Sequence, residues 1–188
     1  MIFLSNFVGM KYLYLSLFLV LTVCSCRHYH TQQPAQDTSA VERLKNEALL
    51  RVNKELVEEE AEEIKTFAQQ RNWQMETTET GLWYMIYENG KGEKAVEGKI
   101  ATLDYTVSRL DSTICYTSKQ LGQKQFLLGK GRLDGIEPGL EEGVLLMREG
   151  DKARLILLPH LAYGLTGDGD CIPRRAIILY DVELVNLK

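Results

Sequence analysis

The sequence predicts an α+β fold, in which a curved antiparallel β-sheet wraps over one short helix and a long helix precedes the sheet. Three observations carry this prediction. Residues 39–72 contain no glycine or proline, residues 138–147 place apolar side chains at helical spacing, and segments after residue 80 alternate between apolar and polar residues. Because strands are predicted on both sides of the short helix, we expect the sheet to pack against that helix.

Residues 1–26 are predicted to be a targeting segment. The apolar run 12–23 is shorter than the roughly 20 residues that a membrane-spanning helix needs. The segment ends in the letters VCSC, which resemble a bacterial lipoprotein signal and predict a lipid on Cys26. A plain secretory signal or an uncleaved anchor is the alternative. Residues 27–38 are polar and predict a flexible tether.

Residues 39–72 are predicted to form one long helix. Ser39 and Glu42 have the spacing of a capping box, and the acidic run at 58–63 must face solvent. The apolar stripe along the segment is ragged and is not a clean heptad repeat. Two arrangements therefore stay open: the helix pairs with a second copy in a homodimer, or it is a monomeric spacer that folds back on the domain.

Residues 80–188 are predicted to form the main domain. Its strands are expected at 80–87, 99–109, 113–117, 125–128, 153–158 and 176–187. In the two longest strands apolar residues recur at every second position, so each strand presents one apolar face. A short helix begins at Pro138, and Gly150 stands where a glycine that ends a helix is common. Residues 163–173 are rich in glycine and aspartate and predict a loop.

Composition argues against several classes of function. The chain has 22 basic and 26 acidic residues, a formal net charge of −4 and no basic stripe, so nucleic acid is not expected as a partner. Its 3 histidines are too few and too scattered to suggest a metal site. The sequence has no phosphate-binding loop, and neither a metal nor a cofactor is predicted.

Five motifs follow one another in the last third of the chain: GLEEGV at 139–144, EGDKARL at 149–155, LAYG at 161–164, IP at 172–173 and YDVEL at 180–184. Together they resemble the C-terminal half of an FKBP-type peptidyl-prolyl isomerase, and the resemblance reaches back to about residue 80. With the predicted lipid on Cys26, the chain is most similar to the FKBP-type lipoproteins of bacteria with gliding-type envelopes. The resemblance implies a prolyl isomerase and chaperone of exported polypeptides, held at the cell envelope by lipid and facing the periplasm.

The resemblance also implies a mechanism without covalent chemistry. Rotation about a prolyl bond must break amide resonance, over a barrier of roughly 18–20 kcal/mol. An enzyme lowers this barrier by binding the twisted amide better than the planar one. An apolar aromatic cup suits that task, because it buries the proline ring and takes the carbonyl away from water, whose hydrogen bonds favour the planar form.

Carried over residue by residue, the resemblance places Tyr105, Tyr163 and Tyr180 at the catalytic positions of this cup. The Tyr163 hydroxyl is expected to donate a hydrogen bond to a substrate carbonyl. Glu137 is expected to contribute its backbone N–H, so that its side chain matters less. The remaining substrate-binding positions are Cys115, Tyr116, Phe126, Ile136, Leu140, Cys171 and Ile172. The alternative is that these side chains belong to an ordinary core.

The chain departs from the family pattern at several of these positions. Cys115 stands where the family has Phe, Tyr116 where it has Asp, and Leu140 where it usually has Trp. Arg174 replaces a second proline, and about three extra residues occur around 131–135. These departures predict reduced activity. They also leave a second function open: a membrane-anchored FKBP-fold module that binds a partner or acts as a chaperone with little catalysis.

Cys115 and Cys171 are the two cysteines that would remain free after processing and lipidation. Neither lies in a CxxC motif, so a zinc site or a thioredoxin-like site is not indicated. The favoured interpretation is two small buried residues. A disulfide is the alternative, because the resemblance places both positions on the same side of the cup and an exported protein more often meets an oxidising compartment.

Overall fold

The computed structural model describes residues 38–188. The predictions on the signal segment, on Cys26 and on the tether up to residue 37 lie outside the described residues. The described residues belong to two units, the first ending at residue 48 and the second comprising residues 49–188. In the first unit, residues 38–48 are helical. Within residues 38–188, no helix is both long enough and apolar enough to cross a bilayer.

Helix α2 spans Thr38–Gln70 and confirms the predicted long helix to within two residues at each end. It ends just before Asn72, which adopts a left-handed conformation with φ of 55°. Near this end of the helix, Ile64 and Phe67 are buried in an apolar cluster with Ile156, Leu158 and Ile177. Burial of these side chains therefore attaches the end of α2 to the sheet.

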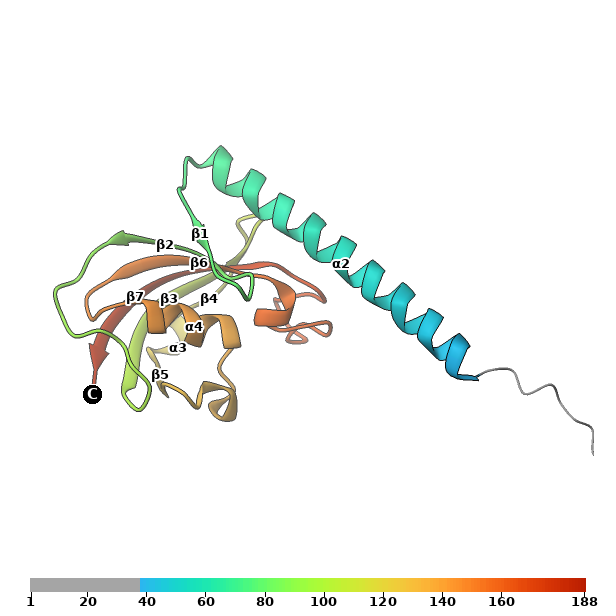
Figure 1. The fold of residues 1–188 in the computed structure, drawn as a ribbon. Helices are drawn as coiled ribbons and strands as arrows, with labels where there is room; N and C mark the ends of the chain where they lie inside the picture. The colour runs from blue at the N-terminus through green and yellow to red at the C-terminus, as the bar shows by residue number, and fades with distance from the viewer. Residues whose placement is uncertain (1–37) are drawn as a thin grey trace, which may run out of the picture. The chain divides into compact units, whose positions relative to one another are not determined.

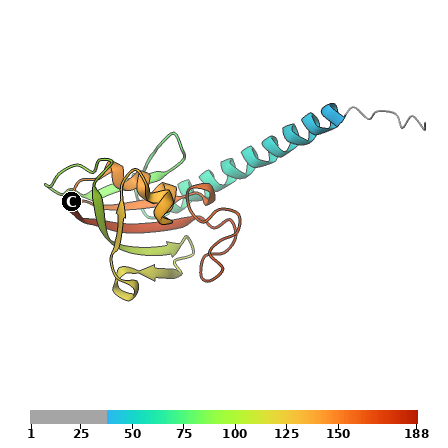
Figure 2. The same cartoon turned by 90° about the horizontal axis from the view of Figure 1, so that it is seen from below.

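The sheet is antiparallel and has the strand order β1-β2-β6-β7-β3-β4, with β5 paired to β3. The strands are β1 Glu76–Thr77, β2 Trp83–Glu88, β3 Ile100–Arg109, β4 Ile114–Thr117, β5 Lys124–Leu127, β6 Lys152–Leu157 and β7 Ile178–Leu187. The two long strands β3 and β7 pair with each other over nearly their full lengths. Figure 2 shows how they form the middle of a curved sheet. The predicted α+β fold is confirmed; only the two-residue strand β1 was not anticipated.

Helix α4 spans Pro138–Leu146 and lies against the inner face of the sheet (Figure 1). Two glycines on the facing side of α4 allow this close approach. A Cβ atom at Gly139 would lie 2.7 Å from Leu157 Cγ, and one at Gly143 would collide with Leu155. The helix ends earlier than its sequence suggests: Gly150, which we expected at the helix end, lies in the turn before β6 with φ of 88°.

The core lies between α4 and the inner faces of β3 and β7. As the alternation predicts, the buried residues are Ala101, Leu103, Tyr105 and Val107 on β3 and Ile178, Tyr180, Val182 and Leu184 on β7. They pack against the fully buried Leu140 and Val144 of α4. Three short helical turns complete the domain: α3 Ser118–Leu121, η1 Gly131–Asp134 and η2 Pro159–Leu161. The segment around 131–135 that looked like an insertion is thus the turn η1.

Candidate functional site

A cluster of aromatic and aliphatic side chains lies between the inner face of the sheet and the first turn of α4. Tyr105 comes from β3 and Tyr180 from β7, and their ring centroids are 6.4 Å apart at an interplanar angle of 50°. Leu140 of α4 is fully buried next to them, and Tyr163 and Ile172 come from the loop between η2 and β7. We call these five residues the cup.

The other predicted positions lie in the same region. Phe126 of β5 and Ile136 before α4 are buried in the same apolar cluster as the cup, and Cys115 and Tyr116 of β4 pack against that cluster. These predicted positions therefore belong to the same apolar core as the cup or pack against it. Within residues 38–188, no group of three or more His, Cys, Asp or Glu side chains is arranged to hold a metal ion.

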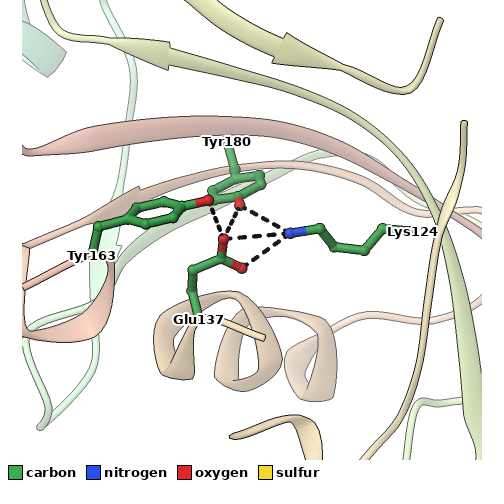
Figure 3. A network of polar contacts seen from close by, with 4 residues as sticks. All are labelled: Lys124, Glu137, Tyr163 and Tyr180. Carbon is green, nitrogen blue, oxygen red and sulfur yellow. Dashed lines mark hydrogen bonds and ion pairs between the residues drawn. The ribbon is translucent and has the colours of Figure 1, made fainter. Parts of the chain in front are cut away.

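Glu137 occupies the interior of this region with its side chain, which is 6% exposed. Its Oε1 atom accepts a hydrogen bond from the Tyr163 hydroxyl and another, of 2.9 Å, from the Tyr180 hydroxyl. Its Oε2 atom lies 3.2 Å from the Lys124 ammonium. Figure 3 shows the side chains of Tyr163, Tyr180 and Lys124 converging on this carboxylate. The expectation that Glu137 matters mainly through its backbone therefore misses a central part of the site.

Lys124 is the cation of this network, and the sequence reasoning missed it. It lies on the same face of β5 as Phe126, two residues earlier. Its Nζ atom is 5.5 Å from the ring centroid of Tyr105 and 5.7 Å from that of Tyr180, within the range of cation–π attraction. It also lies 3.4 Å from the Tyr180 hydroxyl. Lys124 and the buried Phe126 share one face of β5 because they are two residues apart. This alternation was the signal in the sequence that Lys124 points toward the core.

The charge of the network is stable near neutral pH. Burial alone would raise the pKa of the Glu137 carboxyl, but the Lys124 ammonium and the hydrogen bond from Tyr163 outweigh it, and this pKa lies below its ordinary value. Burial first, and then the Glu137 carboxylate, raise the pKa of the phenols of Tyr105, Tyr163 and Tyr180. Glu137 is therefore ionised while the tyrosines keep their protons.

A second carboxylate reaches the rim of the cup from the loop. The Tyr116 hydroxyl donates a hydrogen bond to Asp168, and this bond, together with burial, raises the pKa of the phenol to about 12. The other carboxylate oxygen of Asp168 accepts 2.9 Å hydrogen bonds from the backbone N–H groups of Asp170 and Ile172. Tyr116 thus stands where the family pattern has an aspartate, and Asp168 of the loop brings a carboxylate to the Tyr116 hydroxyl.

A disulfide joins Cys115 of β4 to Cys171 of the same loop, with the Cα atoms 5.5 Å apart. The favoured interpretation of two separate buried cysteines is therefore wrong, and the alternative holds. Both cysteines are only half-buried. The bridge lies next to Tyr116 and Ile172 in the chain, so it fastens the rim of the cup to the edge of the sheet.

The model of the FKBP-type peptidyl-prolyl cis-trans isomerases matches residues 91–185, about half of the chain. The chain belongs to this family. The FKBP-type peptidyl-prolyl cis-trans isomerase FkpA of Escherichia coli strain K12 is 32% identical over 161 residues, which cover 84% of this chain and 57% of that protein. FK506-binding protein 2 of Yarrowia lipolytica is 38% identical over 96 residues, covering 50% of this chain and 65% of that protein. The chain thus spans little more than half the length of FkpA.

Solved structures agree with the family assignment. The crystal structure of FkpA from Escherichia coli aligns with a TM-score of 0.58 and 31% identity, over 81% of this chain and 70% of that one. The crystal structure of AtFKBP13 aligns with a TM-score of 0.56 over 61% of this chain and 99% of that one, and at 24% identity it supports the fold alone. The FKBP fold of this chain therefore carries an ion pair, Lys124 with Glu137, inside a region that the resemblance describes as apolar.

Proposed function

We propose that this FKBP-type chain catalyses cis–trans isomerisation of prolyl bonds in exported polypeptides. The observation that carries the proposal is the convergence of Tyr105, Tyr180 and Leu140 with the loop residues Tyr163 and Ile172 in one cup. These are the positions that the family resemblance assigns to the binding of proline. Their arrangement on a rigid sheet and helix supports a preorganised site.

The proposed chemistry is non-covalent. The rings of Tyr105 and Tyr180 and the side chain of Leu140 would surround the proline ring and displace water from it. Removing water from the prolyl carbonyl destabilises the planar, polar amide relative to the twisted one, and binding the twisted form more tightly lowers the barrier. No side chain needs to act as a nucleophile.

A second candidate is a module that binds prolyl segments with little turnover. One observation favours it: the Tyr163 hydroxyl, the expected donor to the substrate, is already bonded to Glu137. The departures at Cys115, Tyr116 and Leu140 point the same way. Both candidates use the same cup, so they differ in rate and not in the segment that binds.

We further propose that the protein works at the cell envelope, facing the periplasm, with a lipid on Cys26. The lipoprotein-like signal at 23–26 supports this location, and the Cys115–Cys171 disulfide is typical of an oxidising compartment. Homodimerisation through α2 remains a proposal; exposed Leu49, Leu50 and Val52 on the helix support it.

A protease-coupled assay with a chromogenic prolyl peptide tests the function. We expect turnover by the purified protein, and a decrease of kcat/KM of at least about tenfold in Tyr105→Ala, which removes a wall of the cup. The matched control is Tyr87→Ala, which truncates an exposed tyrosine on the outer face. Peptide binding without turnover would favour the binding module, and equal rates in all three proteins would place the site elsewhere.

A further inference from the structure

We propose that the Lys124–Glu137 pair determines the specificity and rate of the cup, by holding the Tyr163 hydroxyl away from the substrate. The inference rests on the proposed function and deepens it. The pair contacts the cup residues directly: Lys124 comes from β5, Glu137 precedes α4, and the hydroxyls of Tyr163 and Tyr180 both meet the carboxylate (Figure 3).

The competition for the Tyr163 proton favours Glu137. A hydrogen bond to an ionised carboxylate is about twice as strong as one between neutral groups. A prolyl substrate offers a neutral carbonyl, so it must displace a stronger acceptor to use the same hydroxyl. The cup therefore binds weakly any segment that depends on Tyr163, and turns over only segments that compensate with other contacts.

The network also resists rearrangement. The Glu137 side chain is 6% exposed, so it cannot exchange its partners for water without moving out of the core. Lys124 is its only cationic partner among the ion pairs of the described residues. Movement of either side chain would leave a buried charge uncompensated, which is strongly unfavourable. The pair thus keeps the hydroxyl occupied in the free protein.

Stability alone does not account for the pair. Buried ion pairs can often be replaced by well-packed apolar side chains of similar volume without loss of stability. Leucine at 137 and methionine at 124 would fill comparable space and leave the hydroxyls of Tyr163 and Tyr180 free. Such a cup would carry no charge, and its only polar groups would be these two hydroxyls. Folding alone therefore does not require a charged pair at these positions.

The test compares Tyr163→Phe in two backgrounds. The first is the native protein, and the second is the double variant Lys124→Met/Glu137→Leu. We expect the double variant to raise kcat/KM about tenfold, the effect of one hydrogen bond regained in the transition state. Tyr163→Phe should then lower kcat/KM about tenfold in the double variant but only about twofold in the native background. If the pair has only a structural role, Tyr163→Phe should lower kcat/KM by the same factor in both backgrounds.

A spectroscopic titration gives a readout that does not depend on turnover. Absorbance near 295 nm follows phenol ionisation, and the difference between each protein and its Tyr163→Phe form isolates this residue. Burial first, and then the Glu137 carboxylate, raise the pKa of Tyr163 in the native protein. We therefore expect Tyr163 to ionise at lower pH in the double variant, which lacks this carboxylate. The Glu137→Gln variant keeps the shape of the side chain and should shift the titration in the same direction if the double variant fails to fold.

The control is the double variant Arg154→Met/Asp181→Leu, which removes an ion pair from the outer face of the sheet. It should leave kcat/KM within about twofold of the native value, since neither residue touches the cup. Equal Tyr163→Phe factors in the two backgrounds, with turnover present, would overturn the inference but not the proposed function. Absence of turnover in every protein would overturn both.

Discussion

The two faces of the sheet carry the same set of chemical groups in different surroundings. On the inner face, Lys124 lies against tyrosine rings and pairs with the buried Glu137. On the outer face, the Arg154 guanidinium lies 4.4 Å from the ring centroids of both Trp73 and Tyr87 and pairs with Asp181 at 3.2 Å. Each face thus has a cation, aromatic rings, a carboxylate and a tyrosine hydroxyl.

The strand β7 supplies both networks from consecutive residues. Tyr180 points to the inner face and Asp181 to the outer face, as successive residues of a strand must. The carboxylate of the outer pair is 39% exposed, against 6% for Glu137. Water can solvate the outer carboxylate if its partner is lost, whereas burial limits the access of water to the inner carboxylate. Burial, more than the identity of the groups, separates a structural contact from a site that can control binding.

Loss of the cation should therefore have very different consequences on the two faces. We expect Lys124→Met to lower the free energy of unfolding by about 3–5 kcal/mol, because it leaves the Glu137 carboxylate buried without a counter-ion. The matched change Arg154→Met should cost only about 1 kcal/mol, since the Asp181 carboxylate remains accessible to water. Urea unfolding of both variants at neutral pH measures the difference. Equal destabilisation by the two variants would show that burial of the carboxylate does not distinguish the inner face from the outer one.

Loss of the disulfide should affect the inner face of the sheet and leave the structure of the outer face unchanged. We expect Cys115→Ser/Cys171→Ser to lower the free energy of unfolding by about 2–4 kcal/mol, the typical effect of a cross-link, here over a sequence separation of 56 residues. The tryptophan fluorescence of the folded protein should stay the same. Both tryptophans of the chain, Trp73 and Trp83, pack in the cluster where α2 meets the sheet.

Peptide mapping without reduction checks that the disulfide is present, because it should recover the peptides of Cys115 and Cys171 joined together. A shifted tryptophan spectrum in the folded double variant would show that the rim and the helix contact are coupled. Unchanged stability would show that the cross-link restrains little of the unfolded chain.

The fold could be predicted from the sequence because its main signals are local. The alternation in β3 and β7 and the helical spacing at Pro138–Leu146 report directly which side chains are buried. The family resemblance assigned the cup residues to one region. In the structure the ring centroids of Tyr105 and Tyr180 are 6.4 Å apart, and the hydroxyls of Tyr163 and Tyr180 meet the same carboxylate oxygen of Glu137. Their role in binding proline stays a prediction.

The ionic network could not be predicted because it depends on contacts between distant segments. A glutamate before a helix usually faces solvent, and nothing local marks Glu137 as buried. For Lys124 the local signal is its place on the face of β5 that carries Phe126, and this place does not reveal its partner. Each is stabilised only once the other is in place and the hydroxyls of Tyr163 and Tyr180 complete the set. The disulfide is similar, since its formation depends on how the loop returns to β4.

Acid should weaken the inner network, and this is the smallest of the expected effects, because protonation removes the charge without removing the side chain. The pKa of Glu137 is lower in the folded protein than its ordinary value of about 4.3, so between these two values the unfolded chain binds more protons. The contribution of Glu137 to stability is therefore present above about pH 5 and is lost as the pH falls through the folded pKa.

Urea unfolding of the native protein and of Glu137→Gln across this range should give a difference in unfolding free energy that is largest near neutral pH and shrinks on acidification. The destabilisation by Lys124→Met should also shrink on acidification, since a neutral Glu137 needs no counter-ion. A difference that stays constant with pH would mean that the carboxylate does not owe its ionisation to Lys124 and the tyrosines, and that the two faces of the sheet differ less than their burial indicates.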